Sequence, residues 1–302
     1  MMIEDEVPNE RVTMDGVQIA KNITEGLKTE IERLQNRFST TSKPKLLCIN
    51  VGNRIESRTY TSNKQKACEK IGGLLEIINF EETATYEQIA QTIEQANKDD
   101  SVNGILVQLP LPKSLNECSI LDLISEEKDV DGLTSINIGR LTTKGRSTTF
   151  YPCAPLAAVL LLKNYGIEIS GKHAVVIGRS NLVGIPLLMM LQKENATVTL
   201  CHTYTHNLRE FTRNADIIAV AVGKPGFLKE DMVKEGCTVI DFGINVVPDN
   251  SEKGFHLTGD VDYNSVSQTA NYISPVPGGV GPMTVAILLS NLVLSWKQTL
   301  RL

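Results

Sequence analysis

The stretch GKHAVVIGRSNLVGIPLLMML, residues 171–191, decides the fold of the second half of this chain. Its apolar residues at 174–177 predict a buried strand that ends at Gly178 and is followed, a few residues later, by an apolar helix. A strand, a glycine turn and a helix in this order can place a phosphate group on the amides of the helix N-terminus. The sequence therefore predicts one βαβ half of a dinucleotide-binding domain over residues 171–202.

The glycine pattern of this turn is incomplete. Gly178 and Gly184 are its glycines, and Ser180 stands where the pattern G-x-G-x-x-G has its second glycine. We therefore expect a wider turn than the standard fingerprint forms. On this pattern alone, a turn that merely joins a strand to a helix remains the alternative.

The residues around the turn favour NADP over NAD. In NAD-binding domains an acidic residue near the end of the next strand binds the ribose 2′-hydroxyl. Here that strand ends in His202 and Thr203, a donor and a hydroxyl, with no acid. Arg179 lies in the turn itself, and a guanidinium can bind a 2′-phosphate through two hydrogen bonds. A solvated loop charge is the alternative for Arg179, but both differences point to NADP.

Strands and helices alternate on both sides of this segment, since some apolar residues recur at helical spacing and others form short runs. The first half has predicted helices at 17–38, 57–72, 85–97 and 115–124 and strands at 45–51, 74–80 and 104–109. The second half has predicted helices at 155–165, 183–192 and 282–300 and strands at 172–177, 197–202, 216–222 and 238–242. We therefore expect an α/β fold with mostly parallel sheets covered by helices.

Two local features refine this division. Thr85 and Gln88 have the spacing of a capping box at a helix start. The stretch 139–155 is polar, contains two prolines and is typical of a linker. Together with a length of 302 residues, this linker predicts two domains.

The composition excludes several classes of protein. A net charge of −5 gives no sign of a nucleic-acid surface. The six cysteines form no C-x-x-C pair, so a zinc ribbon or redox motif is not expected, and we expect buried free thiols in a reducing compartment. The N-terminus has no signal-like apolar core, and no apolar run approaches a membrane span. These observations predict a cytoplasmic protein without a metal site.

Candidate chemistry in the first half gathers at a helix and at the end of a strand. Tyr60 and Lys64 are four residues apart and share one helix face, although such a pair is more often a surface contact. Gln108 ends an apolar strand that Pro110 and Pro112 terminate, where open α/β sheets place their ligands.

Two further stretches are ambiguous by themselves. KDVDGL at 128–133 carries Asp129 and Asp131, and its plain interpretation is a solvated loop. PVPGGVGPMT at 275–284 can bring bare backbone against a flat ligand, and its plain interpretation is a connector.

Together these segments resemble the bifunctional methylenetetrahydrofolate dehydrogenase/methenyltetrahydrofolate cyclohydrolase family. The motifs follow the family's order over nearly the whole chain beyond the N-terminal tail. They are YTSNK at 60–64, GILVQLPLP at 104–112, KDVDGLTSINIGRL at 128–141, GKHAVVIGRSNLVGIP at 171–186, TVTLCHT at 197–203, VIDFGIN at 239–245, GDV at 259–261 and PVPGGVGPMT at 275–284. Each motif is weak singly, and their combination is highly specific.

The resemblance implies a catalytic folate-binding domain over residues 1–152, to which the closing helix 283–302 returns. It implies a Rossmann-like NADP domain over 153–282 and an active-site cleft between the two. It also implies a cytoplasmic homodimer, formed through the cofactor domain, that acts on tetrahydrofolate derivatives in one-carbon metabolism and purine biosynthesis. Neither nucleic acid, membrane nor metal is expected as a partner.

Roles follow from the resemblance for each matching residue. Lys64 would handle protons as water adds to the methenyl carbon, which requires an amine that can lose its proton near neutral pH. Gln108 would position Lys64, Tyr60 would stack on the folate, and Asp131 would bind the pterin. Further folate contacts would come from Val107, Leu109, Pro277, Gly278, Gly279, Val280 and Gly281. Cofactor contacts would come from Gly178, Arg179, Ser180, His202, Thr203 and Ile244.

The implied reaction has two steps: NADP-dependent oxidation of 5,10-methylenetetrahydrofolate, then hydrolysis of the methenyl product to 10-formyltetrahydrofolate. A dehydrogenase that has lost the hydrolysis step is the closest alternative, and the retained Lys64 and Gln108 argue against it. A dinucleotide-binding protein without activity is the alternative from another class.

Overall fold

The computed structural model describes residues 11–53, 55–143, 145–251 and 254–300, with the backbone alone at 55–60. The chain divides into two units. We call Ala20–Cys153 with Val285–Leu302 the three-stranded unit, and Met1–Ile19 with Ala154–Thr284 the six-stranded unit. The helices α1 (Gly16–Phe38) and α10 (Val280–Thr299) contribute residues to both units.

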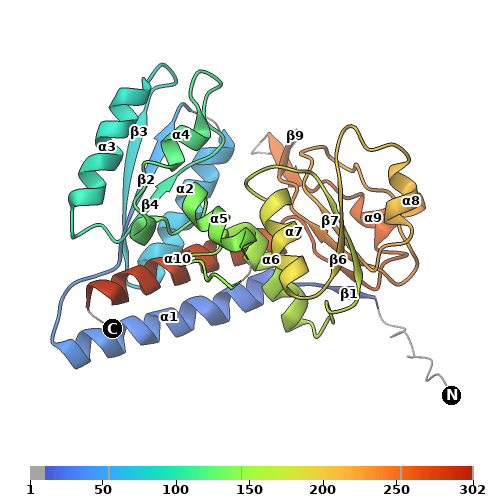
Figure 1. The fold of residues 1–302 in the computed structure, drawn as a ribbon, viewed down its shortest axis with the longest axis horizontal. Coiled ribbons are helices and arrows are strands. Elements are labelled where there is room, and N and C mark those ends of the chain that lie inside the picture. The colour runs from blue at the N-terminus through green and yellow to red at the C-terminus, as the bar shows by residue number, and fades with distance from the viewer. Residues whose placement is uncertain (1–10, 54, 144, 252–253, 301–302) are drawn as a thin grey trace. The chain divides into compact units, whose positions relative to one another are not determined.

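The three-stranded unit contains a parallel sheet in the order β3-β2-β4 (Figure 1). Its strands are β2 (Lys45–Val51), β3 (Leu74–Phe80) and β4 (Gly104–Val107), and its other helices are α2 (Ile55–Lys70), α3 (Tyr86–Lys98), α4 (Glu117–Leu121) and α5 (Ser135–Thr142), with a 3₁₀ turn at Glu126–Lys128. Thr85 and Gln88 form the predicted capping box at the start of α3.

Alternation along the strands separates the two faces of this sheet. Leu47 and Ile49 of β2 pack with Ile89 and Ile93 of α3 in a buried apolar cluster that also includes α4. Cys48 and its neighbours in register lie on the opposite face, toward α2. In Figure 1, α3 and α2 accordingly lie on opposite sides of the sheet.

The last turns of α10 close the three-stranded unit. Asn291 Nδ2 donates to the carbonyl of Val130 at 2.8 Å, and Ser295 Oγ donates to that of Asn103 at 2.6 Å. By length and composition α10 could cross a membrane, so the expectation that no apolar run approaches a span is wrong for this helix. In this structure 61% of the most apolar window of α10 is buried inside the protein, as in the core helix of a folded domain.

The six-stranded unit contains a parallel sheet in the order β1-β11-β8-β7-β5-β6. The strands are β1 (Val12–Thr13), β5 (His173–Ile177), β6 (Thr197–Cys201), β7 (Ile217–Val220), β8 (Thr238–Asp241) and β11 (Tyr272–Ile273). A separate antiparallel hairpin joins β9 (Asn245–Pro248) and β10 (Phe255–Thr258). The helices are α6 (Cys153–Asn164), α7 (Gly184–Lys193), α8 (Leu208–Thr212) and α9 (Tyr263–Val266), with a 3₁₀ turn at Glu230–Met232.

This strand order confirms the predicted α/β fold with mostly parallel sheets. The chain passes from β5 to β6 on one side and then crosses to β7 on the other side of β5. In open α/β sheets, such a reversal leaves a crevice at the carboxyl ends of the strands, where dinucleotides bind.

The structure differs from the predicted domain limits at the N-terminus. We expected residues 1–152 in one domain, but Val12 and Thr13 pair with Tyr272 and Ile273, so residues 11–19 belong with the six-stranded sheet. A pairing across such a separation leaves no local pattern in a two-residue strand.

The predicted linker at 139–155 is also incorrect in part. Residues 139–142 are the end of α5, and α6 begins at Cys153. Between them Phe150 is fully buried, so this segment contributes to the core. Five of the six cysteines are buried free thiols as expected, whereas Cys118 is exposed.

Candidate active site

Lys64 and Gln108 form the centre of the candidate site in the three-stranded unit. Lys64 lies on α2 with 9% of its surface exposed, and its Nζ donates to Gln108 Oε1 at 2.8 Å. The backbone N–H of Gln108 donates to the Ile49 carbonyl at 2.9 Å, which holds this residue at the end of β4. Gln108 Nε2 donates to the Leu109 carbonyl at 3.0 Å, so the amide oxygen is the group that faces the lysine.

Three titratable groups lie within electrostatic reach of Lys64. Burial raises the pKa of Asp131, and the Lys64 ammonium and a hydrogen bond from the Cys153 thiol oppose that rise. Burial raises the pKa of the thiols of Cys48 and Cys153 as well, again against the effect of Lys64. Lys64 thus lies near one carboxyl group, whose pKa is raised, and near two thiols, which stay protonated at neutral pH.

The neighbouring charged residues of KDVDGL have structural roles. Lys128 Nζ donates to the carbonyls of Ala96, Asn97 and Asp99 at 2.7–3.0 Å, which satisfies the C-terminal end of α3. Asp129 is 1% exposed and accepts from residues at the start of α5, and burial raises its pKa. Its donors are Leu133 N, Thr134 N and Asn137 Nδ2. The solvated-loop interpretation is therefore wrong, and Asp131 is the carboxyl group left for ligand chemistry.

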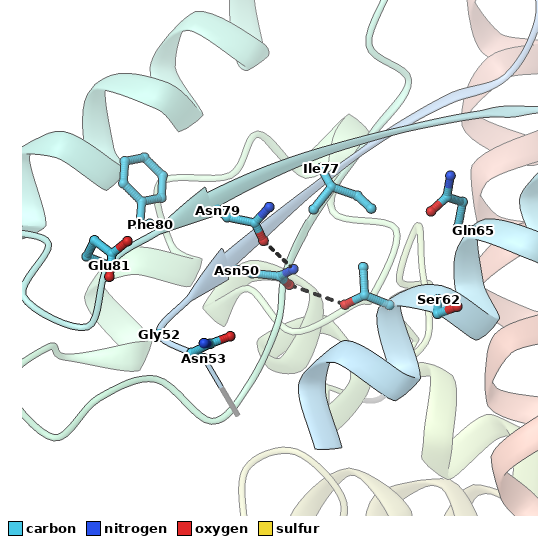
Figure 2. Close-up of a pocket in the computed structure, with 10 residues that line it drawn as sticks. Asn50, Gly52, Asn53, Ser62, Gln65, Ile77, Asn79, Phe80 and Glu81 are labelled. Atoms are coloured by element: carbon cyan, nitrogen blue, oxygen red, sulfur yellow. Dashed lines mark hydrogen bonds between the residues drawn. The ribbon is translucent and has the colours of Figure 1, made fainter. Parts of the chain in front are cut away.

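A pocket of about 490 Å³ opens at the carboxyl ends of β2 and β3, beside α2 (Figure 2). Asn50, which is 7% exposed, donates through Nδ2 to Asn79 Oδ1 at 3.0 Å and accepts from Thr61 Oγ1 at 3.4 Å. The other residues that line the pocket are Gly52, Asn53, Ser62, Gln65, Ile77, Phe80 and Glu81. This pocket was not predicted, although an asparagine within the apolar run KLLCINV is a signal that could have indicated it.

In the six-stranded unit, the turn after β5 requires both of its glycines. Gly178 has a φ of +116°, and a Cβ there would lie 2.2 Å from the Ala221 carbonyl oxygen. A Cβ at Gly184 would lie 2.1 Å from the carbonyl oxygen of Gly178. Ser180 Oγ accepts from Val183 N at 3.1 Å and so satisfies an amide at the start of α7.

The residues predicted to bind the 2′-phosphate of NADP follow the ends of β5 and β6. Arg179 and Thr203 are both exposed, and Arg179 lies over the ring of Tyr204. His202 Nδ1 accepts from the backbone N–H of Tyr204 at 3.2 Å, so this ring nitrogen is used within the loop. The sequence pattern does not single out Tyr204, and its only signal is an aromatic side chain in a polar loop.

Two buried carboxylates hold the loops after β7 and β8. Asp260 is fully buried and accepts three backbone N–H groups, those of Val222, Gly223 and Lys224, at 2.6–2.8 Å. Asp241 accepts the N–H groups of Gly243, Asp260 and Val261 at 2.8–2.9 Å. Burial raises the pKa of Asp241 to about 6. Ile244, a predicted cofactor contact, is 38% exposed beside these loops.

Two backbone hydrogen bonds hold the predicted backbone surface at 277–281. Gly279 N donates to the Pro275 carbonyl and Gly16 N to that of Gly278, both at 2.8 Å. Tyr60 lies in α2, but its side chain falls outside the described residues. Over the described parts of the chain, no three His, Cys, Asp or Glu residues form a group that could hold a metal ion.

Comparisons with known proteins agree with this geometry. Residues 14–131 match the family model described as "Tetrahydrofolate dehydrogenase/cyclohydrolase, catalytic domain". Residues 152–300 match the one described as "Tetrahydrofolate dehydrogenase/cyclohydrolase, NAD(P)-binding domain". The chain is 47% identical to the bifunctional protein FolD of Staphylococcus aureus over 285 residues, 94% of this chain and 96% of that protein.

Solved structures share the fold over almost the entire chain. The N5,N10-methylenetetrahydrofolate dehydrogenase-cyclohydrolase of Trypanosoma brucei, complexed with NADP cofactor and inhibitor, superimposes with a TM-score of 0.93 and 36% identity, covering 97% of this chain and 99% of that one. The bifunctional enzyme FolD of Campylobacter jejuni superimposes with a TM-score of 0.87 and 43% identity, covering 96% and 99%.

Proposed function

The chain belongs to the tetrahydrofolate dehydrogenase/cyclohydrolase family, and on this premise we propose a bifunctional enzyme of one-carbon metabolism. It oxidises 5,10-methylenetetrahydrofolate with NADP and then hydrolyses 5,10-methenyltetrahydrofolate to 10-formyltetrahydrofolate. The observation that carries the hydrolytic half is the hydrogen bond of 2.8 Å from Lys64 Nζ to Gln108 Oε1.

The residues of the six-stranded unit fit a dinucleotide. The turn at Gly178 has no room for a side chain, and exposed Arg179 supplies a cation for a 2′-phosphate. Contacts from Ser180, His202, Thr203 and Ile244 remain predictions. When bound, NADP supplies the hydride acceptor, so the oxidation requires orientation of the reactants more than acid–base help from this chain.

In the hydrolytic step the neutral amine of Lys64 takes up a proton as water adds to the cationic methenyl carbon. The bond from this carbon to N5 then breaks as N5 gains a proton and the hydroxyl group loses its own, which leaves the formyl group on N10 and releases one proton overall. Gln108 holds the amine at the end of β4, because its own amide is fixed by the Leu109 carbonyl. We assign Asp131 to the pterin and Tyr60 to stacking on the aromatic system.

The backbone contacts to folate from the stretches 107–109 and 277–281 remain part of the same proposal. Val107 and Leu109 flank Gln108, and the β2–β4 ladder pairs Val107 with Ile49. The backbone from Pro277 to Gly281 is the other assigned surface, and hydrogen bonds at Gly278 and Gly279 hold it.

Absorbance assays of both steps, with NADP and NAD in parallel, test the proposal. Lys64→Ala should abolish hydrolysis of methenyltetrahydrofolate while NADP still binds. Lys66→Ala, an exposed lysine on the same helix, is the matched control and should leave both steps unchanged. If the unmodified protein oxidises the methylene substrate but hydrolyses the methenyl compound only at the uncatalysed rate, the chain is a monofunctional dehydrogenase.

Assembly and location are part of the proposal too. We propose a cytoplasmic homodimer formed through the six-stranded unit, contributing to purine biosynthesis. The five buried free cysteines are in keeping with a reducing compartment. Light scattering after size-exclusion chromatography tests the dimer, and a monomeric mass at micromolar concentration would contradict it.

A further inference from the structure

Tyr204 is the most exposed large hydrophobic side chain of the described residues, at 77%. Its neighbour is a cation, because Arg179 Cζ lies 5.7 Å from the centroid of its ring. A guanidinium at this distance from an aromatic face is attracted by the ring quadrupole. The exposed ring thus has a partner that belongs to the nucleotide-binding turn.

The register of two strands explains why these side chains meet. Ile177 at the end of β5 pairs with Cys201 at the end of β6, and Gly178 N donates to the Cys201 carbonyl at 2.9 Å. Arg179 and Tyr204 follow these two ends directly. The pairing of β5 with β6 therefore brings these two side chains close together.

The loop that carries Tyr204 is held by its own hydrogen bonds. Thr205 N donates to the His202 carbonyl, and His202 N donates to Thr205 Oγ1, both at 2.8 Å. The His202 ring lies edge-on to the Tyr204 ring, with centroids 6.2 Å apart and planes at 70°. This support keeps the phenol ring in place beside the arginine.

We propose that Tyr204 is a positioning residue that sets selectivity for the adenosine 2′-phosphate by holding the guanidinium of Arg179. A guanidinium that lies on an aromatic face keeps the N–H groups at its edge available for a phosphate. The sequence stretches 178–184 and 202–207 contain no acid that would compete for it. This inference rests on the proposed use of NADP and adds a residue to that site.

The test uses the full chain and two small probes, adenosine 2′,5′-bisphosphate and 5′-AMP, which differ only in the 2′-phosphate. Tyr204→Leu should weaken binding of the bisphosphate about two- to five-fold, the range of an exposed cation–π contact, and leave 5′-AMP unchanged. Tyr204→Phe keeps the ring and should restore wild-type binding. In the Arg179→Ala background, Tyr204→Leu should have no further effect. Phe211→Leu, another exposed aromatic of the same unit, is the control.

Several results would overturn the inference. Equal losses for both probes would mean that the ring contacts the shared adenosine, and a loss in Tyr204→Phe would mean that the hydroxyl is the contact. Additive losses in the double variant would mean that the two residues act independently. Turnover of the unmodified enzyme with NADP, measured alongside, separates these outcomes from failure of the proposed function itself.

Discussion

Replacing Gln108 by glutamate tests the proton-handling role of Lys64 without removing the lysine. The amide oxygen that Lys64 Nζ contacts lies 2.8 Å away, so a glutamate in the same position would place a carboxylate against the ammonium. Lys64 is 9% exposed, and water screens the pair only weakly. The new charge favours the protonated lysine, which cannot accept a proton from water.

The size of this effect follows from the distance. At about 3 Å and an effective dielectric constant of about 20, the Coulomb attraction alone is about 6 kcal/mol. Desolvation of the new carboxylate offsets part of it, and opposite charges this close usually displace a titration by about 1–3 pH units. At a fixed pH near neutrality, Gln108→Glu should therefore slow hydrolysis by roughly 10- to 1000-fold.

The assay is the pH–rate profile of methenyltetrahydrofolate hydrolysis, followed by absorbance. The rising limb should move to higher pH by about 1–3 units, so that raising the pH restores activity. Gln91→Glu adds the same charge at an exposed position of α3 and should leave the profile unchanged. An unmoved limb in Gln108→Glu, or an equal displacement of the dehydrogenase profile, would refute the role of Lys64 in the hydrolytic step.

Three further predictions concern the six-stranded unit. Arg179→Ala should weaken the binding of NADP by roughly 10- to 100-fold and the binding of NAD far less, because a charge-assisted contact to the 2′-phosphate is lost. Titration calorimetry measures both affinities, and equal losses would mean that Arg179 does not bind this phosphate. Asp260→Ala removes a fully buried carboxylate that accepts three partly buried N–H groups, and should lower the free energy of unfolding by on the order of 2–4 kcal/mol. In thermal denaturation the partly exposed Asp249→Ala, which also removes hydrogen bonds, should show a much smaller change, and similar shifts would contradict the dependence on burial. Asp241 has a pKa raised from 3.8 to about 6, so the folded state binds its proton more tightly than the unfolded state does. Its contribution to stability is present below about pH 4 and is lost as the pH rises through about 6, so the stability of the wild type relative to Asp241→Asn should fall by up to about 3 kcal/mol over that window.

Local features of the sequence were sufficient for the longer elements and for the turn, whereas the helices α5, α8 and α9 and the strands β1, β9, β10 and β11 were not predicted. The predicted strands at 45–51 and 74–80 have the limits observed for β2 and β3, and the capping box of Thr85 and Gln88 is present. Both strands and the capping box depend on a pattern or a contact within a few consecutive residues, so the sequence of one segment is enough to predict them. The same holds for Gly178, where the backbone conformation itself excludes a side chain.

Tertiary structure alone decided which polar groups are structural and which are available to a ligand. Asp129 and Asp131 are equivalent in the sequence, and only the fold directs the first to the start of α5 and the second toward Lys64. Asp260 likewise accepts a hydrogen bond from the backbone N–H of Val222, which is 38 residues away in the sequence.

The other features that were not predicted are contacts between residues far apart in the sequence. The pair of Val12 with Tyr272 and the contact of Arg179 with Tyr204 depend on strand order and register. Hydrophobic periodicity determines how a segment folds, but it carries no information about which distant segment becomes its neighbour. For that physical reason the sequence by itself determined the longer elements and the glycine turn after β5, whereas the sheet order decided the partners of their polar side chains.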